Sequence, residues 1–113
     1  HRMSTEACRI VLTQERTGLV NVSAPMQHKA LCYEILRDAA FVIERTEERH
    51  FFNPGKTLLI TMGMDGRVDI AAPLPPREWC LMILKAARLV IEEYDLGGPK
   101  ERPAGYADNL VVP

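Results

Sequence analysis

The feature that most constrains this chain is an internal repeat. Sliding the sequence on itself aligns Ile10–Arg45 with Leu58–Glu93 without a gap. Twelve of the aligned pairs are identical, against about two or three expected for unrelated stretches of average composition. The identical pairs are Thr13/Thr61, Gly18/Gly66, Val20/Val68, Ala24/Ala72, Pro25/Pro73, Cys32/Cys80, Ile35/Ile83, Leu36/Leu84, Ala39/Ala87, Val42/Val90, Ile43/Ile91 and Glu44/Glu92. A match of this length indicates one structural unit written twice, and we call it the repeat alignment.

Each copy predicts two strands followed by a helix. Gly18 and Gly66 end short turns, where a positive φ closes a hairpin. The segments after them alternate between apolar and polar residues, as half-buried strands do. Their polar positions are Asn21, Ser23, Arg67 and Asp69. Pro25 and Pro73 end these strands, and apolar residues then recur at three- and four-residue steps, which predicts a helix with one face on the sheet.

These elements predict an α+β fold, internally duplicated as ββα-ββα, with a four-stranded antiparallel sheet and both helices on one face. The order is a cyclic permutation of the ferredoxin-like order. With the second strands central, the sheet order is 1-2-4-3 and the first helix makes a right-handed crossover; the order 2-1-3-4 stays open. We divide the single domain 1–113 into repeat one 9–45, linker 46–56, repeat two 57–96 and tail 97–113.

Charge and hydropathy patterning argue against two classes of partner. The net charge is −1 and basic residues are scattered among acidic ones, so the chain lacks the basic field that a nucleic-acid binder needs. The longest apolar stretch, Trp79–Leu84, is far too short to span a membrane, and no signal-peptide pattern opens the chain. We therefore expect a cytoplasmic protein without nucleic-acid or membrane partners.

The sequence carries no recognisable motif for catalysis, for a cofactor or for a metal. The three cysteines lack a CxxC spacing, which argues against disulfides and zinc. Cys32 follows His28 at a helix start, a pairing that would suit a nucleophile and its base, but its counterpart Cys80 has Pro76 at the position of His28. Since both cysteines also lie in the apolar stripes, we expect core thiols, no enzyme activity and no cofactor.

Three regions are candidates for a partner or ligand surface. The second helix adds Trp79, Leu81, Met82 and Leu89 outside the shared stripe, and either the tail or linker covers them or they form a homodimer or partner interface. The polar sheet positions Asn21, Ser23, Arg67 and Asp69 form either a ligand surface or an ordinary solvated face. Phe51 and Phe52 in the linker are expected to plug the edge of the core.

The tail after Gly97 is rich in proline and glycine but ends in the apolar residues Leu110–Val112. We expect this end to dock on its own domain, to add an edge to the sheet, or to bind a neighbouring chain.

The stretch Gly18–Tyr33 combines a short hairpin, a proline and a Leu-Cys-Tyr helix start. In this it resembles small proteins of bacteriophage and prophage genomes. The resemblance implies an accessory protein that binds a host protein or sequesters a small signal molecule, and it implies no catalytic residues. We therefore expect a non-catalytic binding protein, of the phage inhibitor type; the alternative is a protein that binds a small nucleotide-derived signal where symmetric subunits meet.

Overall fold

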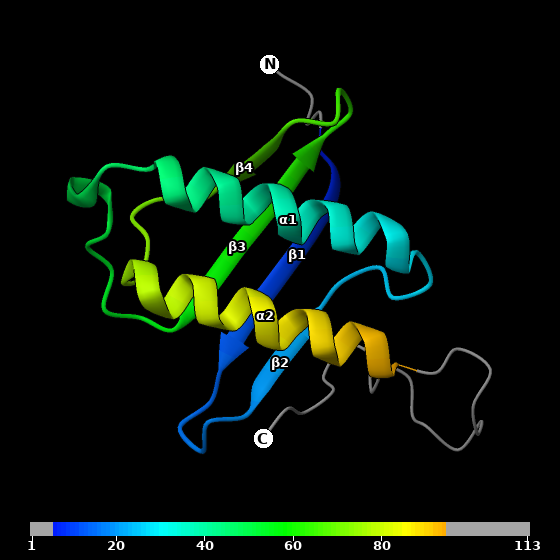
Figure 1. The fold of residues 1–113 in the computed structure, drawn as a ribbon, viewed down its shortest axis with the longest axis horizontal. Coiled ribbons are helices and arrows are strands. Elements are labelled where there is room, and N and C mark those ends of the chain that lie inside the picture. The colour runs from blue at the N-terminus through cyan, green and yellow to red at the C-terminus, as the bar shows by residue number, and fades with distance from the viewer. Residues whose placement is uncertain (1–5, 95–113) are drawn as a thin grey trace.

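The computed structural model describes residues 6–94, which form a four-stranded antiparallel open sheet with two helices, an α+β fold (Figure 1). The element order is ββαββα, with a short 3₁₀ turn, η1, between the halves. The elements are β1 Glu6–Gln14, β2 Val20–Ser23, α1 Lys29–Arg45, η1 Glu48–His50, β3 Thr57–Gly63, β4 Val68–Ile70 and α2 Arg77–Glu93. None of the helices in this part of the chain has the length and apolar character that crossing a membrane requires.

The strand order is β2-β1-β3-β4, with every neighbouring pair antiparallel. The order 1-2-4-3 is therefore wrong, and the first strands of the two halves are the central pair. The physical reason lies in length and hydrophobicity. β1 and β3 have 9 and 7 residues against 4 and 3 for β2 and β4, and their middle residues are apolar on both faces. Short strands suit the edges of a sheet because they expose few unpaired backbone groups.

The two hairpins form as the glycine positions predict. Gly18 and Gly66 have φ values of +93° and +85°, a conformation that other residues enter only at a cost. The amide of each glycine donates to a carbonyl across its turn, Gly18 to Glu15 and Gly66 to Gly63. Each turn thus returns the chain from a central strand to an edge strand.

Both helices cover one face of the sheet and run in opposite directions (Figure 1). Their apolar stripes are buried, and the repeat alignment pairs the members of the two stripes. Buried stripe residues shared by both helices are Cys32/Cys80, Ile35/Ile83, Leu36/Leu84, Ala39/Ala87 and Ile43/Ile91. They meet the inward residues of the strands, such as Ile10, Leu12 and Ile60, in a single apolar core.

Each helix covers the strands of the opposite half. α1 follows β2 in the chain but packs against β4 and β3, whereas α2 packs against β2 and β1. The chain therefore passes over the sheet between β2 and α1, and again between β4 and α2 (Figure 1). The Lys29 ammonium group donates to the carbonyl of Glu92, 3.1 Å away, and so joins the start of α1 to the end of α2.

The linker is held against the loop that precedes α2. The amide of Asn53 donates to the carbonyl of Leu74, and the amide of Leu74 donates to the carbonyl of His50. Phe51 packs against the core, as expected, but Phe52 is 82% exposed, so its predicted role as a plug is wrong. The hydrogen bonds turn neighbouring side chains to opposite sides. The predicted docking of Leu110–Val112 lies outside the described residues.

Two neighbouring residues of β3 provide a test of this architecture, because they point to opposite faces of the sheet. Leu59 and Ile60 are neighbours in β3, but Ile60 is fully buried under the helices, while Leu59 points to the other face and is only partly buried. We expect Ile60→Ala to lower the free energy of unfolding by about 2–5 kcal/mol and Leu59→Ala by about 1 kcal/mol, measured by urea denaturation. Equal losses would mean that a further layer covers the outer face.

Candidate binding surfaces

The predicted surface residues of the second helix divide between the interior and the exterior. The indole Nε1 of Trp79 donates to Gln14 Oε1 at 2.8 Å, and its ring packs against the core, so Trp79 fastens α2 to β1. Met82 and Leu89 are 41% and 51% exposed. Being seven residues apart, they share the outward side of α2. Leu81 is partly buried and faces the groove between the helices.

The predicted polar residues of the sheet lie along its two opposite edges, on the face that the helices leave uncovered. Asn21 and Asp69 stand on the two edge strands, opposite Thr13 and Thr61 of the central strands. The amide nitrogen of Asn21 donates to Glu15 Oε2 at 2.7 Å, and the Arg67 guanidinium lies 3.7 Å from the Asp69 carboxylate. Ser23 is exposed. These groups are thus partly engaged with one another.

The centre of that face is apolar, which the sequence analysis missed. Val11 and Leu59 are direct partners in the central strand pair, and Val11 also faces Ser23. The missed signal was the unbroken apolar runs Ile10–Leu12 and Leu58–Ile60. Such runs indicate central strands with apolar residues on both faces.

A groove runs between the outward sides of the two helices. Its cavity of about 320 Å³ has an apolar floor formed by Leu36, Ala40, Leu81 and Leu84. Four of its lining pairs match in the repeat alignment: Tyr33/Leu81, Leu36/Leu84, Arg37/Lys85 and Ala40/Arg88. The groove therefore lies where the two antiparallel helices turn the same side toward each other. Phe41 and Leu89, another aligned pair, are exposed apolar residues on the outward sides of the two helices.

The rim of the groove is charged and mainly basic. Arg37, Lys85 and Arg88 line it together with a single acid, Glu44. The Arg88 guanidinium stacks 4.4 Å from the centre of the Tyr33 ring and bonds Glu92 at 3.0 Å. Arg37 lies 3.6 Å from the Asp38 carboxylate, so the positive charge that borders the apolar floor is partly neutralised.

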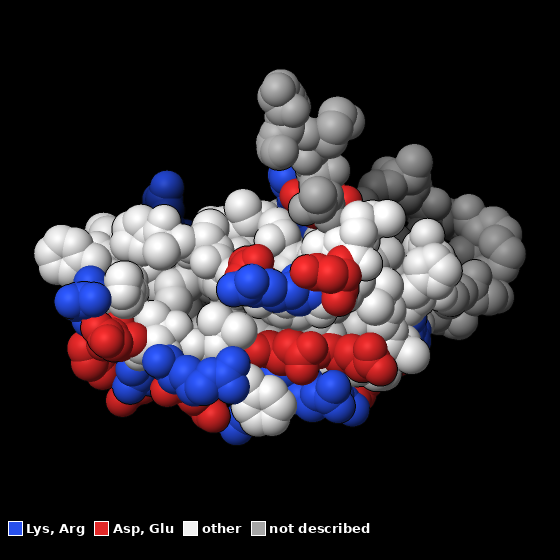
Figure 2. All heavy atoms as spheres, turned by 90° about the horizontal axis from the view of Figure 1, so that it is seen from above, with Lys and Arg blue, Asp and Glu red and all other residues white. Residues whose placement is uncertain are grey.

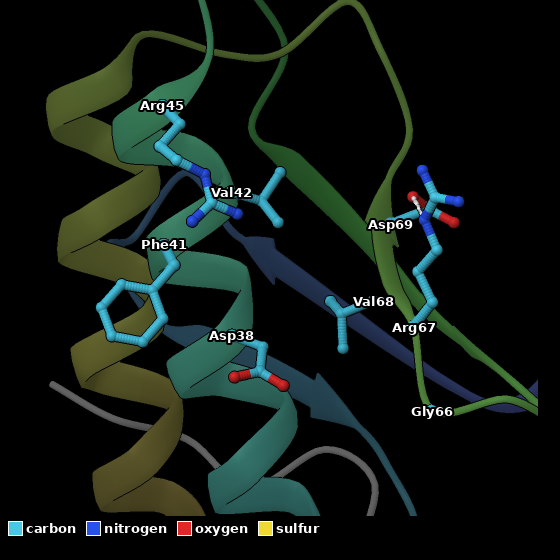
Figure 3. Close-up of a pocket in the computed structure, with 8 residues that line it drawn as sticks. All are labelled: Asp38, Phe41, Val42, Arg45, Gly66, Arg67, Val68 and Asp69. Carbon is cyan, nitrogen blue, oxygen red and sulfur yellow. Dashed lines mark ion pairs between the residues drawn. The ribbon is translucent and has the colours of Figure 1, made fainter.

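A second hollow lies beside β4, on the side of the molecule seen in Figure 2. Basic and acidic side chains are interleaved on this side, with uncharged surface between them (Figure 2). The hollow between α1 and β4 has a volume of about 530 Å³. In Figure 3, Val42 and Val68 face this space from the helix and the strand, whereas Arg67 and Asp69 point away from α1. We call this hollow the α1/β4 cleft.

The thiols of Cys32 and Cys80 are core groups. Both residues are fully buried, and their Sγ atoms donate to the carbonyls of Pro25 and Pro75 at 3.4 and 3.3 Å. Burial raises the pKa of each thiol to about 11, because the apolar surroundings disfavour the thiolate. Burial and the raised pKa both fit a packing role for these thiols in the core.

Within residues 6–94, no three His, Cys, Asp or Glu side chains come together in a way that could hold a metal ion. The groove and the cleft are lined by apolar side chains together with basic and acidic ones. No family model, curated protein or solved structure matches the chain.

The raised thiol pKa values predict a loss of stability in alkali. The unfolded thiols titrate near 9 and the folded ones near 11, so the contribution is complete below pH 9 and is lost as pH rises toward 11. Urea denaturation at a series of pH values measures it. In the Cys32→Ala/Cys80→Ala variant the decline above pH 9, taken relative to its own value at pH 7, should be shallower. An unchanged slope would contradict this origin.

Proposed function

We propose that the protein is a non-catalytic binding protein that docks a partner protein in the groove between its helices. The observation that carries the proposal is the apolar floor of the groove, which lies between two helices whose outward sides also expose Phe41, Met82 and Leu89. Grooves of this kind accept the apolar face of an amphipathic helix. A third helix laid between α1 and α2 would bury the apolar floor of the groove.

The charges on the rim suggest the chemistry of that partner. Three basic residues and one acid line the groove, so a partner helix with acidic residues flanking its apolar face would be favoured. Rim charges chiefly guide the approach of a partner, while the apolar centre of an interface supplies most of the affinity. The partner is therefore an acidic amphipathic helix of another protein.

The biological setting of this activity is also a proposal. The hairpin, proline and Leu-Cys-Tyr pattern supports an accessory or inhibitory protein of the phage type that acts on a host protein in the cytoplasm. We further infer that the two halves descend from one duplicated ββα unit, because the repeat alignment pairs both helix stripes and most of the groove. Only the order of elements along the chain, and not the strand order in the sheet, matches a permuted ferredoxin-like arrangement.

Charge reversal on the rim tests the groove. The immobilised full chain is incubated with bacterial lysate, and retained proteins are identified and titrated against wild type, Arg37→Glu/Lys85→Glu and the control Arg16→Glu, which lies on the β1–β2 turn. We expect the double variant to slow association with the retained partner by about tenfold and the control to leave it unchanged. Retention that is equal for all three proteins would contradict the groove.

A second copy of the chain is the competing occupant, since a homodimer was one of the expectations. Sedimentation of the wild type over a range of concentrations separates the two cases. A monomer at the concentrations used for binding supports docking of a different protein. A dimer that the double variant abolishes would replace the proposal with self-association.

A small anionic ligand, such as a nucleotide-derived signal, is the second candidate. Two observations favour it: the volume of the groove falls in the range of small-molecule sites, and the Tyr33 ring lies beside Arg88. A stacked base and a phosphate would use these two groups.

Thermal unfolding against a panel of mononucleotides and cyclic nucleotides tests this candidate. A true ligand at a hundred times its dissociation constant raises the free energy of unfolding by about 2.7 kcal/mol. The variant Tyr33→Leu, which installs the residue present at the aligned position Leu81, should abolish the gain for a stacked base and leave protein docking intact. No gain with any nucleotide would exclude the compounds tried.

A further inference from the structure

The outer edge of β4 presents unpaired backbone groups. The amide of Gly63 donates to the carbonyl of Arg67, and the amide of Ala71 donates to the carbonyl of Leu59, while Asp69 faces Thr61. Because bonding alternates along an antiparallel strand, residues 67, 69 and 71 bond to β3. The N–H and C=O groups of Val68 and Ile70 therefore point outward, where they can pair with another strand.

A continuous groove accompanies this edge. The α1/β4 cleft and a neighbouring cavity of about 370 Å³ share two lining residues, Val42 and Arg45. The second cavity continues past Ile70 to Leu74. The hollow thus extends along β4 and beyond it, between the strand and the last turns of α1 (Figure 3).

We propose that an extended peptide of a partner protein binds here as a fifth strand of the sheet, with an aliphatic side chain on Val42 and Val68 and a carboxylate on Arg45. Strand addition derives affinity from backbone hydrogen bonds and specificity from pockets for alternate side chains. The edge supplies the hydrogen bonds and the cleft supplies the pockets. This surface is separate from the groove between the helices, so the inference does not rest on the proposed function.

The charges in the cleft select the carboxylate. Asp38 also lines the cleft but lies 3.6 Å from Arg37. Arg67 is paired with Asp69 on the other side of the strand, and Arg49 bonds Glu47 at 2.9 Å. Arg45 has no ion-pair partner within residues 6–94, and it lines both cavities. A carboxylate is its natural partner because a guanidinium binds that group through two parallel hydrogen bonds.

A second copy of this chain is the competing occupant of the edge. Antiparallel pairing of two β4 edges about a twofold axis at Asp69 would set two carboxylates opposite each other, which destabilises a strand pair, whereas an axis at Val68 would set Arg67 opposite Asp69 of the other copy. The test therefore separates a second copy from a peptide of another protein by its dependence on protein concentration.

The test uses the full chain labelled with ¹⁵N and capped heptapeptides of alternating valine and threonine that carry Glu, Gln or Lys at one central position. We expect the Glu peptide to shift the amide signals of Val68 and Ile70, to slow their hydrogen exchange at least tenfold, and to bind at least tenfold more tightly than the Lys peptide. Arg45→Glu should reverse this preference, whereas the control Arg16→Glu should keep it.

Four results would overturn the proposal. The first is a panel in which no peptide slows exchange at Val68 and Ile70. The second is equal slowing at Val20 and Val22, whose backbone groups occupy the corresponding edge of β2. The third is slow exchange at Val68 and Ile70 in the free protein. Slow exchange that does not depend on protein concentration would indicate that the chain's own tail occupies the edge, and slow exchange that increases with concentration would indicate a second copy. The fourth is an unchanged preference in Arg45→Glu.

Discussion

The antiparallel pairing of β1 with β3 is the contact on which the rest of this structure depends. It joins the two halves in the middle of the sheet, with Ile10 opposite Ile60 and Leu12 opposite Leu58, all four beneath the helices. Once these strands are central, tight hairpins place β2 and β4 at the edges. The helices must then return over the opposite half to bury their stripes, and this sets both the groove and the α1/β4 cleft.

Much of the fold could be predicted because its signals are local. Gly18 and Gly66 mark turns, alternation around Val20 and Val68 marks strands, and the stripes through Cys32 and Cys80 mark helices. Strand order could not be predicted from local signals, because both candidate orders bury the same inward residues. The decision depends on strand length and on Val11 and Leu59, which are apolar positions on the face that the helices leave uncovered.

The candidate surfaces were harder to predict because exposure depends on loop and helix placement. Met82 and Leu89 are outward, but Trp79 is drawn inward by its hydrogen bond to Gln14. Phe51 and Phe52 are chemically alike and adjacent. In the linker that is hydrogen-bonded to Leu74, however, Phe51 packs against the core and Phe52 is exposed. The position of Arg45 in the cleft could not be predicted, because its charged sequence neighbours are typical of a solvated helix end. The cleft forms only where α1 lies beside β4.

The crosswise cover of the sheet has a consequence for how the molecule is held together. Neither ββα half can bury its own helix stripe on its own strands, since α1 rests on β3 and β4 and α2 on β1 and β2. A chain cut within the linker would give two fragments whose apolar surfaces are each completed only by the other. The two halves are thus packed like the subunits of an obligate heterodimer. The linker keeps them at equal stoichiometry because it makes them one chain.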